Sequence, residues 1–168
     1  MIIKLAKSPS EAHDSADRYE SDTGKYGTSH TLDDIKKIYD TVLKEFKEIG
    51  ENRIIFIGYE DNKPVGTVQL ILKRADNDPE LANGSTIAHI HHLRVGYQHH
   101  KSGKGRELME YIEKYSKNHG IRTLTLGVDN WNTNAIGFYE HLGYKKFKEA
   151  TGRTPKERVD YFRKDIVS

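Results

Sequence analysis

The chain has 168 residues, 27 basic and 25 acidic side chains, a net charge of +2 and no cysteine. A chain of this length typically folds as one domain around one hydrophobic core, so we expect a single domain over residues 1–168. The charge balance gives no reason to expect nucleic acid or an anionic membrane as a partner. The lack of cysteine excludes disulfides, thiolate metal ligands and a cysteine nucleophile.

The apolar runs of the chain are short. None approaches the roughly 20 residues of a membrane span, and the run at residues 2–6 is too short for a signal peptide. We therefore expect a cytoplasmic protein with no membrane partner. The run itself predicts a short edge strand.

The next fifty residues predict helices. A first helix is expected near residues 10–20, and the polar stretch 19–30 reads as a loop. Residues 31–49 are the clearest helix, because their apolar side chains repeat with the helical period. Gly50 is typical of the residue that follows a helix.

Three strands are predicted in the middle of the chain. Residues 53–59 and 64–73 read as a hairpin around the turn at 60–63. The polar stretch 74–85 connects them to a third strand, residues 86–95.

A loop at residues 96–102 and a helix running to about residue 119 follow this strand. Residues 123–128 then predict a buried strand. Because a strand–helix–strand crossover joins it to residues 86–95, these two strands should be parallel.

The last segments are a short helix, two strands and a loop between the strands. The helix is expected at residues 132–142 and the strands at residues 144–148 and 158–166, with the loop at residues 149–156. The order β-α-α-β-β-β-α-β-α-β-β predicts an α/β (α+β) fold. Its sheet should be mixed and mostly antiparallel, with six or seven strands and helices on both faces.

The loop before the third helix has the chemistry of a phosphate site. Gly103 and Gly105 let the backbone approach a ligand, and the new helix adds unpaired N–H groups and a positive dipole end. Lys101, Lys104 and Arg106 add positive charge. The spacing lacks the third glycine of a dinucleotide site and the Gly-Lys-Ser/Thr of a nucleoside-triphosphate loop.

This loop resembles the acyl-coenzyme A loop of the GNAT acyltransferases, whose usual form is Val-x-x-x-x-Arg/Gln-x-x-Gly-x-Gly/Ala. Val95, Gly103 and Gly105 stand at the matching positions. His100 stands where Arg or Gln is usual.

A second block strengthens the resemblance. The family's form is Asn-x-x-Ala-x-x-Phe-Tyr-x-x-x-Gly-Phe. Tyr144 stands in the place of the last Phe, and the other positions are matched by Asn132, Ala135, Phe138, Tyr139 and Gly143.

The resemblance implies a central pair of parallel strands that splay apart and receive acetyl-coenzyme A. The opened backbone of Leu93 and Val95 would pair with the pantetheine amides, and Asn132 would hydrogen-bond the same arm. The remaining coenzyme contacts are expected from His100, Lys101, Ser102, Gly103, Lys104 and Gly105.

The family moves an acetyl group by direct attack of an amine on the thioester. Tyr139 matches the position that supplies an acid to the departing thiolate; the alternative is a tyrosine that packs on the sheet. The attacking amine must first lose a proton, because an alkylamine has a pKa of about 10.

Histidines on the third strand are candidates for this proton transfer. Strand alternation puts His89 and His91 on the face of Leu93 and Val95, unless a bulge shifts the parity. Their spacing is similar to that in arylalkylamine N-acetyltransferases. The alternative is that one or both are buried and neutral. His92 is expected on the opposite face, in a structural role.

We expect no metal, because His89 and His91 have no obvious carboxylate companion in the sequence. The predicted function is an N-acetyltransferase that uses acetyl-coenzyme A and a small-molecule or peptide amine. The alternative is a non-catalytic module that binds coenzyme A. A homodimer is possible by analogy with the family.

Overall fold

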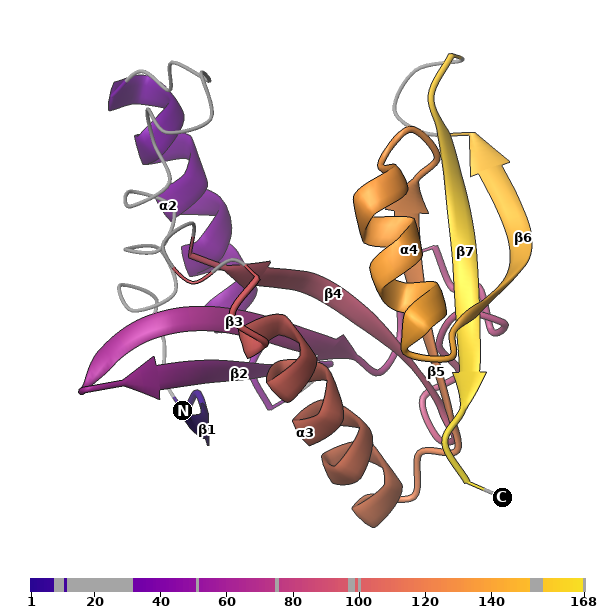
Figure 1. Ribbon diagram of the computed structural model, residues 1–168, viewed down its shortest axis with the longest axis horizontal. Coiled ribbons are helices and arrows are strands. Elements are labelled where there is room, and N and C mark those ends of the chain that lie inside the picture. Colours follow the sequence, from indigo (N-terminus) through magenta and orange to yellow (C-terminus); the bar gives the residue numbers. More distant parts are fainter. Residues whose placement is uncertain are drawn as a thin grey trace. The chain divides into compact units, whose positions relative to one another are not determined.

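The structure is a computed structural model, and Figure 1 shows its elements. It describes residues 1–7, 11, 32–50, 52–74, 76–96, 99, 101–151 and 156–167, with residues 32–39 described by their backbone alone. The strands are β1 (Ile2–Leu5), β2 (Arg53–Glu60), β3 (Lys63–Ile71), β4 (Ile87–Val95), β5 (Thr123–Asp129), β6 (Lys145–Thr151) and β7 (Arg158–Asp165). The helices are α2 (Leu32–Lys47), α3 (Lys104–Asn118) and α4 (Thr133–His141).

Two of the predicted segments fall largely outside the described residues. The polar loop at residues 19–30 is one, and the helix near residues 10–20 is the other, of which residue 11 alone is described. Elsewhere β6 extends to Thr151, into the stretch that was predicted as a loop.

The seven strands form one sheet in the order β1-β2-β3-β4-β5-β7-β6. The β1–β2, β5–β7 and β6–β7 pairs are antiparallel, whereas β4 and β5 are parallel. The crossover through α3 predicted this parallel pair. The predicted mixed sheet is therefore confirmed.

The chain divides into two compact units. The first comprises residues 1–70 and 92–112, and the second comprises residues 71–91 and 113–168. Strand β4 and helix α3 each contribute to both units. Among the described helices, none is long and apolar enough to cross a membrane.

Helices cover both faces of β2 in the first unit. One face packs on α2 and forms a core cluster of Ala6, Val42, Phe46, Ile55 and Ile57. Side chains alternate along a strand, so Phe56 faces the other way. There its ring meets Tyr111 of α3 edge-on, with 5.6 Å between ring centroids.

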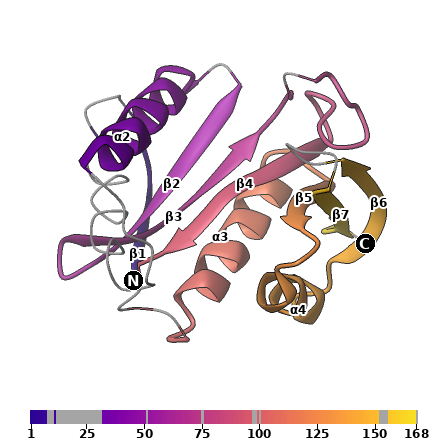
Figure 2. The same ribbon diagram turned by 90° about the horizontal axis from the view of Figure 1, so that it is seen from above.

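In the second unit, α4 lies along β5 and β7, as Figures 1 and 2 show from two directions. Tyr139 of α4 meets the ring of buried Tyr144, and Lys164 of β7 lies over that same ring. Lys164 is in register with Leu124 of β5, so α4 covers the Leu124 side of the strands. Thr125 points to the opposite side.

Candidate active site

The loop between β4 and α3 is held by backbone hydrogen bonds within the first unit. The Gly96 N–H donates to the Val65 carbonyl of β3 (2.9 Å), and the His99 N–H donates back to Gly96 (2.8 Å). Gly103 has φ +82°, a conformation that favours glycine. Among the described residues, apart from its own chain neighbours, none has a heavy atom within 4 Å of a Cβ built on Gly103. The loop therefore presents open backbone directly before a helix.

Helix α3 begins at once after this glycine. The Glu107 N–H donates to the Gly103 carbonyl (3.0 Å), which closes the first helical turn. The first N–H groups of a helix have no partner within it, and they carry the positive end of its dipole. A helix start of this kind is a common phosphate site, and the phosphate role expected for the glycine loop stays a prediction.

The charged side chains of the loop have different surroundings. Lys104 forms an ion pair with Glu60 at the end of β2, and 16% of its side chain is exposed. This contact raises the pKa of Lys104 and lowers that of Glu60. Lys101 is exposed, and the Ser102 hydroxyl donates to the His99 carbonyl. His100 lies outside the described residues.

Strands β4 and β5 both continue beyond their parallel register. The register runs from Ile87 opposite Thr123 to Ile90 opposite Leu126. Leu93 and Val95 lie in the later part of β4, where both are half-buried.

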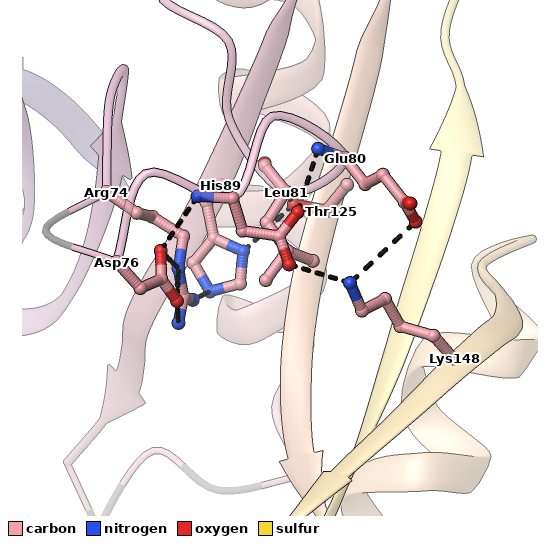
Figure 3. Close-up of polar contacts among 8 residues, drawn as sticks. Arg74, Asp76, Glu80, Leu81, His89, Thr125 and Lys148 are labelled. Atoms are coloured by element: carbon pink, nitrogen blue, oxygen red, sulfur yellow. Dashed lines mark hydrogen bonds and ion pairs between the residues drawn. The ribbon is translucent and has the colours of Figure 1, made fainter.

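His89 is buried, and both of its ring nitrogens have polar partners (Figure 3). Nη1 of Arg74 lies 2.9 Å from Nε2, and Oγ1 of Thr125 lies 2.9 Å from Nδ1. Arginine can only donate, so Nε2 must accept and Nδ1 must carry the proton. Burial, reinforced by the charge of Arg74, lowers the pKa of His89 to about 3.

The connection between β3 and β4, residues 72–86, makes further polar contacts around His89, Arg74 and Thr125. The Thr125 hydroxyl donates to the Leu81 carbonyl at 2.6 Å. Arg74 also forms an ion pair with Asp76 at 2.9 Å. Lys148 of β6 contacts Asp78 at 2.6 Å, and Figure 3 shows these contacts around one end of the connection. The sequence suggested only a polar link here.

A second polar cluster contains His92, which lies in the part of β4 that belongs to the first unit. Nδ1 of His92 lies 3.0 Å from Oε1 of Glu45, a residue of α2 that is 8% exposed. The Gln69 amide donates to Oε2 of the same carboxylate at 2.7 Å. Burial works to raise the pKa of Glu45, but the contacts with His92 and Gln69 outweigh it, so this pKa lies below its usual value.

His92 also interrupts the regular strand. Its φ is +47°, so the alternation that assigned side chains to faces does not continue through it. Glu45 is a carboxylate partner of His92 that the sequence analysis did not identify. One signal was present: Glu45 falls among Val42, Phe46 and Ile49 at helical spacing, on the apolar face.

Helix α4 carries the last two predicted site residues. Oδ1 of Asn132 accepts a hydrogen bond from the Ala135 N–H (3.2 Å), so this side chain caps the helix. Tyr139 is half-buried, and its ring meets Phe138 and Tyr144 edge-on at 5.1 and 6.1 Å.

Comparison with known proteins decides the family. A model of the acetyltransferase (GNAT) family matches residues 16–144. The chain belongs to this family. It is thus an enzyme, an acyltransferase of the GNAT N-acetyltransferase type, and the resemblance seen in the glycine loop and in the Asn132 block is confirmed.

Individual relatives agree with this assignment. An uncharacterized N-acetyltransferase of the pepI 3′ region in Lactobacillus delbrueckii subsp. lactis is 29% identical over 128 residues, which cover 74% of this chain and 72% of that protein. A putative GNAT acetyltransferase from Desulfovibrio desulfuricans has the same fold, with a TM-score of 0.76, 15% identity and 99% of each chain covered. An aminoglycoside 6′-N-acetyltransferase complexed with coenzyme A has a TM-score of 0.69 and 17% identity, covering 100% of this chain and 98% of its own.

Proposed function

We propose that this GNAT enzyme transfers the acetyl group of acetyl-coenzyme A to a primary amine by direct attack, within one domain spanning residues 1–168. The observation that carries the proposal is the open backbone at Gly103, with φ +82°, at the start of α3. A diphosphate is the ligand chemistry that such a backbone site suits best. A structural neighbour that holds coenzyme A supports the choice of coenzyme.

The coenzyme would extend from this loop along β4. The diphosphate would accept hydrogen bonds from the N–H groups of residues 101–105, with Lys101 adding charge. Lys104 would act indirectly, since its contact with Glu60 fastens the start of α3 to the end of β2. The backbone of Leu93 and Val95, together with Asn132, would hold the pantetheine arm. His100 stays a prediction for the diphosphate site.

Tyr139 is the proposed acid for the departing thiolate. A tyrosine hydroxyl has a pKa near 10 and is protonated at neutral pH, so it can donate to a thiolate as the carbon–sulfur bond breaks. Its support is the match of the Asn132 block to the family pattern.

The histidines of β4 remain the proposed route for the proton of the amine. His91 is the member of the predicted pair to which we assign this role. His89 would act as a positioning residue, because its Nε2 is occupied by Arg74 and its pKa of about 3 keeps the ring neutral.

The acceptor is proposed to be a small-molecule amine. Three structural neighbours are aminoglycoside 6′-acetyltransferases, one of them from Enterococcus faecium. An aminoglycoside is therefore the first acceptor to test, followed by a polyamine, an arylalkylamine and a peptide N-terminus.

A thermal-shift comparison of acetyl-coenzyme A, ATP and NAD tests the coenzyme assignment. Ligand at 100 times Kd stabilises a protein by about 2.7 kcal/mol, which raises the Tm of a domain of this size by roughly 5–10 °C. We expect a shift with acetyl-coenzyme A and none with ATP or NAD. A shift with ATP alone would contradict the proposal, and a coenzyme shift without transfer to any amine would favour the non-catalytic alternative.

A further inference from the structure

The ring of Tyr139 packs against a residue that departs from the family pattern. Tyr144 stands where that pattern has Phe, and the two rings meet edge-on with 6.1 Å between their centroids. We infer, on the basis of the acid role proposed above for Tyr139, that the Tyr144 hydroxyl is anchored on Glu113 and positions Tyr139 for proton donation. Tyr144 and Glu113 are then positioning residues, which act through Tyr139 and do not touch the substrate themselves.

Tyr144 contacts Tyr139 through its backbone and through its side chain. The Tyr144 N–H donates to the Tyr139 carbonyl at 3.0 Å, across the turn in which Gly143 has φ +92°. The ring planes meet at an angle of 74°. The backbone contact belongs to the end of α4. The ring contact makes the pose of the half-buried Tyr139 side chain depend on where the Tyr144 ring lies.

Polar contacts from two other elements of the second unit fix the Tyr144 ring. This residue is 1% exposed, and its hydroxyl donates to Oε1 of Glu113 on α3 at 3.0 Å. Nζ of Lys164 on β7 donates to both oxygens of the same carboxylate, at 3.0 and 2.9 Å. The same Nζ lies 5.5 Å from the centre of the Tyr144 ring. The carboxylate thus joins the hydroxyl to a strand as well as to a helix.

Tyr144 can serve as an anchor but not as the acid itself. Burial, reinforced by the charge of Glu113, raises the pKa of Tyr144 above its ordinary value. The hydroxyl therefore keeps its proton at neutral pH, and it directs that proton to a carboxylate that can only accept. Between the two tyrosines, the half-buried Tyr139 remains the candidate for contact with the thiolate.

A phenylalanine at position 144 would make the same ring contact, but packing alone would hold it. The hydroxyl adds a directional bond to a charged acceptor, which is stronger than a bond between neutral groups. Precise placement matters for a catalytic group, because a displacement of about 1 Å can lower a rate by about 10²-fold. The departure from Phe to Tyr therefore gives this chain a firmer support for its proposed acid.

Tyr144→Phe removes the anchor and keeps the ring. With the amine found active with the wild type, we expect kcat to fall by about tenfold, while the affinity for acetyl-coenzyme A stays the same. Tyr115→Phe, the matched control on α3, should leave kcat unchanged. Full kcat in Tyr144→Phe would overturn the inference.

Two variants of Glu113 test the acceptor. Glu113→Gln keeps an oxygen that can accept from the Tyr144 hydroxyl, whereas Glu113→Leu leaves that buried hydroxyl without an acceptor. Both break the ion pair with Lys164, which is partly exposed and can reach water, so their comparison isolates the acceptor oxygen. We expect Glu113→Gln to retain kcat and Glu113→Leu to lower it as Tyr144→Phe does. Equal losses in both variants would overturn the inference.

Combined variants distinguish positioning of the acid from a general structural role. If Tyr144 acts through Tyr139, Tyr144→Phe should lower kcat in the wild type and should have no further effect in Tyr139→Phe. A structural role elsewhere would lower kcat by the same factor in both backgrounds. Such equal factors would overturn the inference.

Carbon-13 NMR of the tyrosine rings tests the positioning without turnover. The Tyr139 signal is assigned by its loss in Tyr139→Phe, and the rate of its ring flips is compared in the wild type, Tyr144→Phe and Tyr115→Phe. We expect faster flips in Tyr144→Phe alone. Unchanged flips there would overturn the positioning role, even if Tyr139→Phe has a large loss of kcat. Full kcat in Tyr139→Phe would instead contradict the acid role itself, so the two failures are distinct.

Discussion

Arg74 donates from Nη1 to Nε2 of His89 across 2.9 Å, and this contact makes His89 a neutral, hydrogen-bonded part of the second unit. The guanidinium cannot lose its proton, so the ring must supply the lone pair. Thr125 and Leu81 complete the chain of hydrogen bonds on the other side of the ring. Protonation of His89 would break this contact, and acid stability should therefore depend on it.

The first prediction concerns stability against pH. The pKa of His89 is about 3 in the folded protein, against an ordinary value of 6.5. Between about pH 3 and pH 6.5 the His89 ring is therefore protonated in the unfolded chain and neutral in the folded protein. The free energy of unfolding should fall by about 1.4 kcal/mol per pH unit as the pH drops from 6.5 toward 3.

Urea unfolding between about pH 4.5 and 7 measures this slope. His89→Gln removes the titrating group, so this variant should be less stable at pH 7 but should lose less stability on acidification. Equal slopes in the two proteins would contradict the buried, neutral state of His89.

Thr125→Val tests the same chain of hydrogen bonds without a change of shape. The buried hydroxyl joins the His89 ring to the Leu81 carbonyl, and its loss leaves both groups unsatisfied. We expect a loss of about 2–4 kcal/mol in the free energy of unfolding. Thr123→Val is the control on the same strand, because its partner Asp165 is exposed and can turn to water. A cost at Thr125 no larger than that at Thr123 would argue against the chain.

Gly103→Ala tests the coenzyme loop, with Gly120→Ala as its control. Both glycines have φ +82°, and at both a Cβ would meet no atom of the other described residues within 4 Å. The strain of an alanine should therefore be similar, about 1–2 kcal/mol at each. Only Gly103→Ala should weaken acetyl-coenzyme A binding, because its Cβ enters the space proposed for the diphosphate. Calorimetric titration of both variants measures this, and equal affinities would mean that the diphosphate binds elsewhere.

Tyr139→Phe tests the proposed acid. The substitution keeps the ring contacts with Phe138 and Tyr144 and removes only the hydroxyl. We expect kcat to fall by about 10²-fold while coenzyme affinity stays the same. Tyr115→Phe, on α3 where the ring stacks on His119, should have no effect on kcat. Unchanged kcat in Tyr139→Phe would contradict the acid role and would favour the alternative that Tyr139 only packs on the sheet.

Local patterns were enough to predict most of the fold. The helical period ending at Gly50 predicted α2, and the crossover through α3 predicted that β4 and β5 are parallel. Gly103 predicted the loop before α3, because glycine adopts positive φ readily, whereas Gly105 lies within the helix. These signals lie within a few residues of the structure that they determine.

The polar clusters could not be predicted in the same way. Arg74 and His89 are 15 residues apart, His89 and Thr125 are 36 apart, and Gln69 and Glu45 are 24 apart. Whether such distant residues meet depends on the register of the strands and on the path of the connection between them. Local sequence patterns do not predict either. The positive φ of His92 was likewise hidden, since histidine has no strong preference for that conformation.

Initial rates of coenzyme A thiol release, measured while both acetyl-coenzyme A and an acceptor amine are varied, test the account most directly. Direct attack predicts that release depends on the amine, that the double-reciprocal lines intersect, and that the amine gains one acetyl group in mass. Release that no aminoglycoside, polyamine, arylalkylamine or peptide accelerates, or parallel lines with an acetylated protein, would contradict it.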